Sequence, residues 1–170
     1  MTVADKSSIW FAVVNGYAAS SKAVHAWVKA EECLKAKGII YHGNRTGKSG
    51  NAMEITFDAC MAGYRRFIAV GGDGTIHDVL NGIAAYLDWA VEAGKSLNFS
   101  DFTLGVIPVG SGNDWIKSIG VPKDVEIAAA LFEKAQTRPQ DVVKVSALDF
   151  DKLPEYQEIA QSYMVNIGGV

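Results

Sequence analysis

The sequence predicts an α/β fold in which a parallel sheet carries helices on both of its faces. Short, continuous apolar runs alternate along the chain with segments whose apolar residues recur at helical spacing. Strands and helices that alternate in this way form right-handed crossovers, so the strands run parallel. Two glycine-rich stretches each follow an apolar run. Ligands of such sheets bind beyond the carboxyl ends of the strands, which is where these stretches are expected.

The composition limits the class of protein. With 170 residues, 49% hydrophobic and 21% charged, the chain can bury one domain core and hold the start of another. A net charge of −3 and the lack of a long Lys/Arg run argue against nucleic acid as the main partner. No segment has the roughly 20 apolar residues of a membrane span, and no signal peptide is recognisable. We therefore expect a cytoplasmic protein that meets membranes only peripherally.

The cysteines and histidines do not predict a metal centre. Cys33 and Cys60 lack a CxxC or Cys/His partner and lie on the apolar side of helical patterns. His25 and His77 have no HxxxH or Glu/His spacing. We expect two free, core-facing thiols and no metal ligands among these residues.

The first half of the chain reads as strand, helix, strand, helix. Ile9–Val14 is a continuous β-rich run, typical of a strand covered on both faces. A helix is expected from about Ser21, and Gly38 is placed to end it. A second strand is predicted at Ile39–Tyr41 and a second helix at Asn51–Met61.

The next part repeats the pattern. Arg66–Val70 is a clear strand that runs into a glycine-rich loop, and apolar residues over Ile76–Leu87 mark the helix that follows. Thr103–Pro108 is the next strand, followed by a short helix that ends near Gly120. A last helix is expected to start around Asp124, after a proline.

The pattern changes in the last thirty residues or so. Two β-type runs stand there without a helical stripe of comparable strength, at Asp141–Ser146 and Tyr163–Ile167. Residues 148–161 between them are polar and irregular, apart from a helical turn at 155–160. We predict a nucleotide-binding domain over residues 1–139 and the start of an incomplete C-terminal β domain over residues 140–170.

The loop Gly71–Thr75, with the sequence GGDGT, is the most informative feature. Its glycines let the backbone approach a ligand without Cβ atoms in the way. The loop amides and the following helix N-terminus favour an anion, and a phosphate chain is the natural occupant. Because a carboxylate would repel phosphate and the loop suggests no packing role for it, Asp73 is predicted to act through Mg²⁺ or as an acceptor for a hydroxyl proton. A tight turn with an N-cap aspartate is the alternative, but such a turn does not need three glycines.

The second glycine-rich stretch, Ile107–Trp115, should lie beside the first. Ser111 could donate to a phosphate oxygen, while Asn113 and Asp114 are good caps for the next helix. Taken alone, this stretch is explained equally well by a capped turn.

Residues 43–49 approach the phosphate-loop pattern GxxxxGK[ST] but do not match it. His42 stands where the first glycine is required, so we do not expect a true loop of that kind. Arg45 and Lys48 either screen phosphate charge or belong to a solvated loop.

The segments GGDGTIHDVLNGI (71–83) and IPVGSGNDW (107–115) resemble the catalytic domain of the diacylglycerol kinase family, which includes bacterial lipid kinases, sphingosine kinases and ceramide kinases. Residues 46–52 and 15–18 are similar to its TxxxGHA and NPxSG segments. NAD kinases and phosphofructokinases share a GGDGT-like loop, but the GSGND segment about thirty-five residues downstream favours the lipid kinases. The resemblance implies a Rossmann-like fold of the NAD kinase/diacylglycerol kinase type, plus the first strands of a truncated β-sandwich.

The chain departs from the family pattern at four positions. Asp78 stands where the family usually has Glu and Ser111 where it has Thr, and both changes preserve the chemistry of the side chain. Gly16 replaces Pro and Asn51 replaces His in the less specific segments. Nucleotide binding is therefore still expected.

The resemblance implies an ATP- and Mg²⁺-dependent lipid kinase of lipid metabolism, which transfers the γ-phosphate of ATP to a lipid hydroxyl at a membrane surface. Asp73 is the predicted catalytic residue. The predicted nucleotide-binding residues are Asn15, Thr46, Gly71, Gly72, Asp73, Gly74, Thr75, Asp78, Gly110, Ser111 and Asn113. A catalytic Glu and the Mg²⁺ ligands of bacterial members are expected in a C-terminal domain beyond this chain, so the chain alone should be inactive.

Two other functions stay open: an NAD kinase-like enzyme, and a nucleotide-binding fragment without catalysis. The sequence does not name the lipid or the oligomeric state, for which a homodimer is one candidate.

Overall fold

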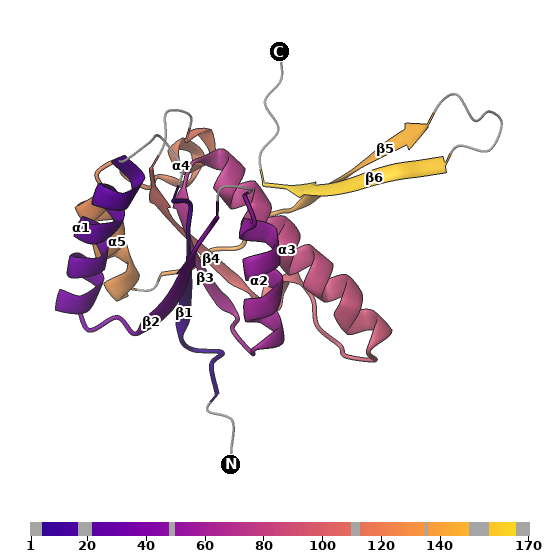
Figure 1. Cartoon of the computed structure of the whole chain (residues 1–170), viewed down its shortest axis with the longest axis horizontal. Coiled ribbons are helices and arrows are strands. Elements are labelled where there is room, and N and C mark those ends of the chain that lie inside the picture. The colour runs from indigo at the N-terminus through magenta and orange to yellow at the C-terminus, as the bar shows by residue number, and fades with distance from the viewer. Residues whose placement is uncertain are drawn as a thin grey trace.

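The computed structural model describes residues 5–16, 22–47, 50–109, 113–134, 136–149 and 157–165. Within them, a four-stranded parallel sheet has the order β2-β1-β3-β4 (Figure 1). The strands are β1 (Trp10–Val14), β2 (Tyr41–Arg45), β3 (Arg66–Gly71) and β4 (Thr103–Pro108). Their register places Val14 beside Arg45 and Val70, and Gly71 beside Pro108. The carboxyl ends of all four strands therefore meet at one edge, and the predicted α/β fold is confirmed.

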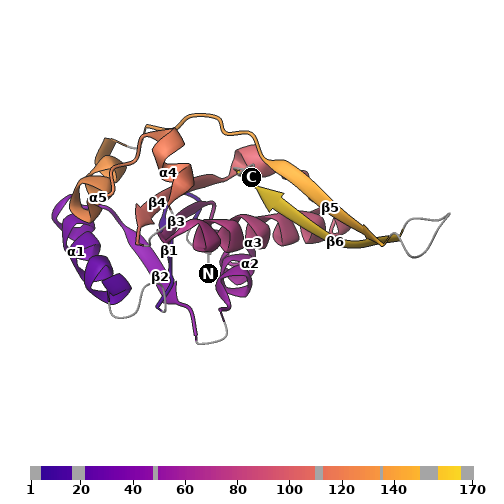
Figure 2. The ribbon, with the colours of Figure 1, turned by 90° about the horizontal axis from the view of Figure 1, so that it is seen from above.

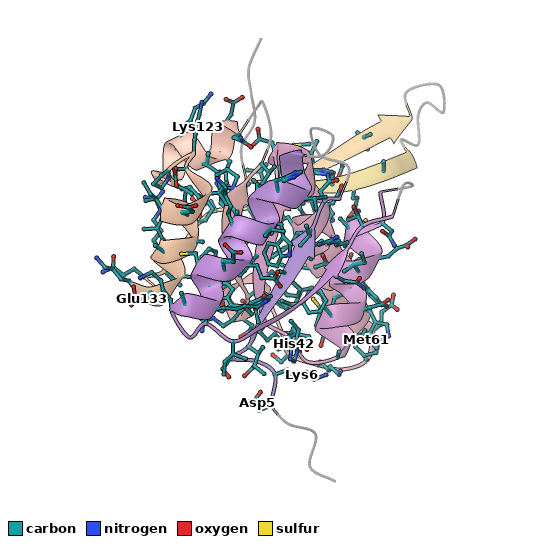
Figure 3. All side chains as sticks on the ribbon, turned by 60° about the vertical axis from the view of Figure 1, so that its left-hand side comes forward. Asp5, Lys6, His42, Met61, Lys123 and Glu133 are labelled. Carbon is teal, nitrogen blue, oxygen red and sulfur yellow. The ribbon has the colours of Figure 1, made fainter. Side chains whose placement is uncertain are left out.

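Helices cover both faces of the sheet (Figures 1 and 2). One layer holds α1 (Lys22–Ala36) and α5 (Val125–Lys134), and the other holds α2 (Ala52–Met61) and α3 (Asp73–Glu92). A short 3₁₀ helix, η1 (Phe99–Asp101), precedes β4, and a short helix, α4 (Asp114–Ile119), follows it. Side chains fill the spaces between the sheet and the two layers (Figure 3).

The core divides into two apolar clusters, one on each side of the sheet. Ala12, Val14 and Ile68 pack with the α1 and α5 side, and Val13 and Phe67 pack with the α2 and α3 side. Because successive residues of a strand point to opposite faces, a strand buried on both faces must be apolar throughout. This explains the continuous apolar runs in the sequence.

Strand β2 lies further along the chain than predicted. It starts at Tyr41, and the predicted Ile40 precedes it with 69% of its surface exposed. The cause is the pairing with β1, which fixes residues 41–45 opposite Trp10–Val14. A Cβ atom on Gly43 would lie 2.9 Å from the carbonyl oxygen of Ala12. Residues 43–45 therefore form an extended strand and not a phosphate loop, while Lys48 lies outside the described residues.

Strands β5 (Val143–Asp149) and β6 (Gln157–Met164) form a separate antiparallel hairpin, and the end of β6 contacts α3 at Ser162 and Tyr163. The predicted helical turn at 155–160 is wrong, because residues 157–160 pair with β5. The second strand also starts earlier than the predicted Tyr163, and residues 166–170 lie outside the described residues. The small sheet is consistent with the start of a β-sandwich, and the boundary at residues 139/140 stays a prediction.

In the described part of the chain, no helix has the length and apolar character that crossing a bilayer would require. Cys33 and Cys60 are both free thiols, as expected. Burial raises the pKa of Cys60 to about 12, so this thiol stays protonated at neutral pH and serves as a core residue.

Candidate active site

Backbone hydrogen bonds join neighbouring segments at the edge of the sheet where the strands end. The amide of Asn15 donates to the carbonyl of Val70 (3.0 Å), and the amide of Thr46 donates to the carbonyl of Val14 (2.9 Å). On the other side of β3, the amide of Val109 donates to the carbonyl of Gly71 (2.9 Å). The segments after β1, β2, β3 and β4 therefore leave the sheet at one edge. The predicted residue Asn15 lies beside the glycine-rich loop, and the predicted Thr46 lies on the far side of β1.

The loop itself is a sharp passage from β3 into α3. Gly72 is the N-cap residue, and Asn15 Nδ2 donates to the Oγ1 atom of the buried Thr75 (3.0 Å). A Cβ atom on Gly71 would lie 2.1 Å from Thr75 Oγ1, so Gly71 is required by a contact inside the protein. Around Gly74, in the first turn of α3, a Cβ atom would meet no atom of the described residues within 4 Å apart from its chain neighbours and the helix's own backbone. Gly74 is thus an open position that leaves room for a ligand.

Asp73 has a structural contact that the sequence did not suggest. Its Oδ2 accepts a hydrogen bond from the amide of Asp114 (2.8 Å), and its Oδ1 accepts one from the amide of Trp115 (3.2 Å). The carboxylate at the start of α3 therefore caps the N-terminus of α4, where backbone amides lack helical partners. The expectation that the two glycine-rich stretches lie side by side is confirmed, and the expectation that Asp73 has no packing role is wrong.

The residues predicted to cap α4 behave differently from expectation. Asn113 is buried in a left-handed conformation (φ 56°) and makes no side-chain capping bond. Asp114 forms an exposed ion pair with Lys117, which lowers the pKa of Asp114 and raises the pKa of Lys117. The prediction from local sequence failed because Asp73, forty-one residues away, takes the capping position. The predicted Gly110 and Ser111 lie outside the described residues.

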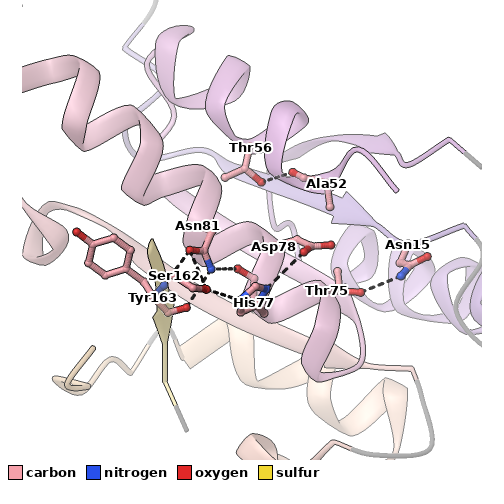
Figure 4. A network of polar contacts seen from close by, with 9 residues as sticks. All are labelled: Asn15, Ala52, Thr56, Thr75, His77, Asp78, Asn81, Ser162 and Tyr163. Atoms are coloured by element: carbon pink, nitrogen blue, oxygen red, sulfur yellow. Dashed lines mark hydrogen bonds and ion pairs between the residues drawn. The ribbon is translucent and has the colours of Figure 1, made fainter. Parts of the chain in front are cut away.

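Asp78, in the second turn of α3, is half-exposed and contacts the neighbouring His77 (Nδ1 to Oδ1, 3.5 Å). The other ring nitrogen of His77 lies 2.7 Å from the hydroxyl of Ser162 on β6 (Figure 4). One turn later, Asn81 bonds to the backbone of Tyr163. The sequence analysis missed these contacts, since a pairing across about eighty residues leaves no local pattern.

Asp73 is the carboxylate at this edge whose oxygens could bind a metal ion. Among the described residues, no group of three or more His, Cys, Asp and Glu side chains could hold a metal ion. Mg²⁺ is commonly bound by one or two carboxylates together with substrate phosphates. Asp73 and Asp78 are five residues apart on α3, about 140° around the helix axis, so the two carboxylates do not face one point. Each oxygen of Asp73 retains a second lone pair, and Asp73 would bind such an ion, which would neutralise charge on phosphate oxygens when bound.

A cavity of about 760 Å³ lies between α1 and the free edge of β2. Of the residues predicted to bind nucleotide, none that the structure describes lines it. Tyr41, on its wall, donates a hydrogen bond to Glu31 (2.6 Å), and this bond lowers the pKa of Glu31. The cavity runs along β2 and reaches the edge where the strands end at Val14 and Arg45.

The chain is similar to known proteins in both sequence and fold. The family described as "Diacylglycerol kinase catalytic domain" matches residues 10–145. The chain is 30% identical over 134 residues to a protein of Klebsiella pneumoniae (strain 342) named "Probable lipid kinase YegS-like", covering 79% of this chain and 40% of that one. It is 36% identical over 103 residues to the "Diacylglycerol kinase" of Bacillus subtilis (strain 168), covering 60% of this chain and 30% of that one.

The fold matches as well. The crystal structure of a diacylglycerol kinase from Bacillus anthracis str. Sterne superposes with a TM-score of 0.64 at 26% identity, covering 82% of this chain and 44% of that one. The chain spans less than half the length of each of these relatives. Since the family match includes the whole parallel sheet and both glycine-rich stretches, the chain belongs to the diacylglycerol kinase catalytic domain family.

Proposed function

We propose that this chain is the nucleotide-binding part of an ATP-dependent lipid kinase. One observation carries the proposal. Asn15, Thr46 and the glycine-rich loop lie at the same edge of the sheet, in a chain that belongs to this family. Phosphates of ATP would bind at the start of α3, where backbone amides and the helix dipole favour anions. Gly74 leaves the space for that approach.

The proposed reaction is transfer of the γ-phosphoryl group to a lipid hydroxyl. The bond between the γ-phosphorus and the bridging oxygen breaks, a bond from the lipid oxygen to that phosphorus forms, and the hydroxyl proton leaves to a base. The products are ADP and a phosphorylated lipid. In such reactions positioning and charge neutralisation supply most of the rate. We assign Asp73 to the Mg²⁺-bound phosphates and Asp78 to nucleotide binding, in a cytoplasmic protein that reaches its lipid at the membrane surface.

The test uses labelled ATP with the natural full-length protein and, separately, with the 170-residue chain. We expect the full-length protein to phosphorylate a lipid from a panel that includes diacylglycerol and sphingosine. The chain alone should bind ADP or ATP weakly and transfer no phosphate to lipid. The reason is that loss of alignment between acceptor and γ-phosphate can forfeit about 7–11 kcal/mol of barrier reduction. Phosphorylation of NAD in place of lipid would favour the NAD kinase alternative, and vigorous lipid phosphorylation by the 170-residue chain would contradict the need for the rest of the protein.

Thr46 provides a test of the nucleotide site in the 170-residue chain. We expect Thr46→Ala to remove a hydroxyl that donates to a nucleotide phosphate, which weakens ATP binding by about 1.5–3 kcal/mol, measured by titration calorimetry. A matched control is Thr56→Ala, because Thr56 is also buried and its hydroxyl donates to the carbonyl of Ala52 within α2 (2.8 Å). The control should lower stability and leave affinity unchanged. Equal ATP affinity in Thr46→Ala and the unaltered chain would remove Thr46 from the site. Ser111→Ala is expected to act as Thr46→Ala does.

A further inference from the structure

Helix α3 is tied to strand β6 by the side-chain amide of Asn81. Its Nδ2 donates to the carbonyl oxygen of Tyr163 (2.9 Å), and its Oδ1 accepts from the amide of the same residue (2.9 Å). The second hydrogen of Nδ2 is used as well, in a bond to the carbonyl of His77 (2.8 Å). Figure 4 shows this arrangement from close by. One side chain thus pairs with a strand residue as a neighbouring strand would.

The hydrogen bonds admit only one orientation of this amide. If Oδ1 and Nδ2 were exchanged, the oxygen would face two carbonyl oxygens and the nitrogen would face an N–H group. Only Asn has a side chain of this length with a donor and an acceptor in these places. The shape of Asp is almost the same, but a carboxylate oxygen would then face both carbonyls.

Apolar contacts also hold the hairpin near α3, without fixing its position along the helix. The rings of Phe99 and Tyr163 are 5.3 Å apart, and Val165 packs against the core cluster beneath α3. Apolar contacts of this kind are not directional, so they tolerate a shift of the strand. The two bonds from Asn81 to one residue define which residue of β6 stands opposite the helix.

The same side of α3 also carries the glycine-rich loop and the cap of α4. Asp73, His77 and Asn81 recur at intervals of four residues, so they lie on successive turns. Asp73 binds the start of α4, His77 contacts Ser162, and Asn81 holds Tyr163. With a rise of about 1.5 Å per residue, the hairpin contact lies about 12 Å along the axis from Asp73. A helix of twenty residues is a stiff connection over that distance.

We propose that Asn81, assisted by His77, is a positioning residue that sets the hairpin, and the acceptor-binding part built on it, at a fixed place relative to the phosphate loop. This inference rests on the proposed function, in which the lipid hydroxyl must meet the γ-phosphate in line. Asn81 touches neither ATP nor lipid. It acts on transfer only through the placement of β6.

The contact is tested first in the 170-residue chain, by hydrogen exchange of the Tyr163 amide. In Asn81→Asp we expect exchange to be about tenfold faster or more, because the carboxylate repels the carbonyls of His77 and Tyr163. The matched control is Asp88→Asn, an exposed position further along the same helix, which should leave exchange unchanged. If Asn81→Asp does not fold, Ser162→Ala alters the same contact from the hairpin side and should give a smaller increase. Unchanged exchange in the folded variants would show that this contact does not hold the hairpin.

The positioning role is tested in the natural full-length protein. Asn81→Asp should lower kcat for lipid phosphorylation about tenfold or more and leave the KM for MgATP within about twofold of the unaltered enzyme. A misplaced acceptor also lets water take the phosphoryl group, so the ratio of inorganic phosphate released to lipid phosphorylated should rise. Partial unfolding alone would lower both products together and leave that ratio unchanged.

The outcomes separate this proposal from the proposed function. Faster exchange with an unaltered kcat and product ratio would overturn the positioning role while the kinase activity stands. If the unaltered full-length protein phosphorylates no lipid, the proposed function fails and the role in transfer fails with it. The exchange measurement would still decide whether Asn81 fixes the hairpin.

Discussion

Asp73→Asn in the natural full-length protein is expected to reduce lipid phosphorylation by a factor of about 10² to 10³. This is the usual effect of removing one group that stabilises charge in a transition state. The substitution removes the negative charge of the Asp73 side chain, which we assign to binding the Mg²⁺-bound phosphates. It also replaces one carboxylate oxygen by an NH₂ group, which cannot accept a hydrogen bond. The backbone amide of either Asp114 or Trp115 then loses its acceptor. Some loss of stability at α4 is therefore expected, about 1–3 kcal/mol for the unsatisfied amide.

The two effects of this substitution can be measured separately. Thermal unfolding measures the loss of stability at α4. Transfer of labelled phosphate to lipid, at a temperature where the variant is fully folded, measures the loss of catalytic activity. Asp88→Asn is the control for charge on the same helix, because Asp88 is exposed and lies about four turns from the loop. Near wild-type turnover by folded Asp73→Asn would refute the catalytic assignment and leave only the capping role.

Gly82→Ala is expected to destabilise the chain by about 1–3 kcal/mol. A Cβ atom at this buried position of α3 would lie 2.5 Å from the carbonyl oxygen of Met53 and 2.6 Å from Cβ of Thr56, both on α2. Alanine favours a helix over glycine by up to about 1 kcal/mol, but that gain is smaller than the usual cost of forcing two packed helices apart. The midpoint of thermal unfolding should fall by roughly 2–4 °C for each kcal/mol lost.

The matched variant is Gly74→Ala in the first turn of the same helix. Its Cβ position is open apart from the chain neighbours and the helix's own backbone, so stability should be unchanged or slightly higher. The added methyl group would instead occupy the space assigned to phosphate, and ADP affinity should fall about tenfold or more. Gly82→Ala should show the reverse, with lower stability and retained affinity when folded. Equal nucleotide affinity in Gly74→Ala and the unaltered chain would move the phosphate site away from the start of α3.

The local sequence was sufficient for most of the architecture. Apolar periodicity and glycine-rich turns depend on residues close together in the chain, so they predict the order of strands and helices and place both glycine-rich stretches at strand ends. The same information placed β4 at Thr103–Pro108 and the free thiols in helices. The resemblance in residues 71–83 and 107–115 predicted the family that the comparisons show.

Contacts between distant residues decided what the sequence alone could not. β2 occupies Tyr41–Arg45 because pairing with β1 overrides the β propensity of Ile39 and Ile40. Asp73 caps α4 from forty-one residues away, and Asn81 binds Tyr163 eighty-two residues away. The strand at 157–160 likewise depends on its partner β5. Each of these features depends on hydrogen bonds between residues that meet only once the chain has folded, so no pattern within a short window of sequence encodes it. Periodicity and turn chemistry, in contrast, are present in the sequence before folding begins.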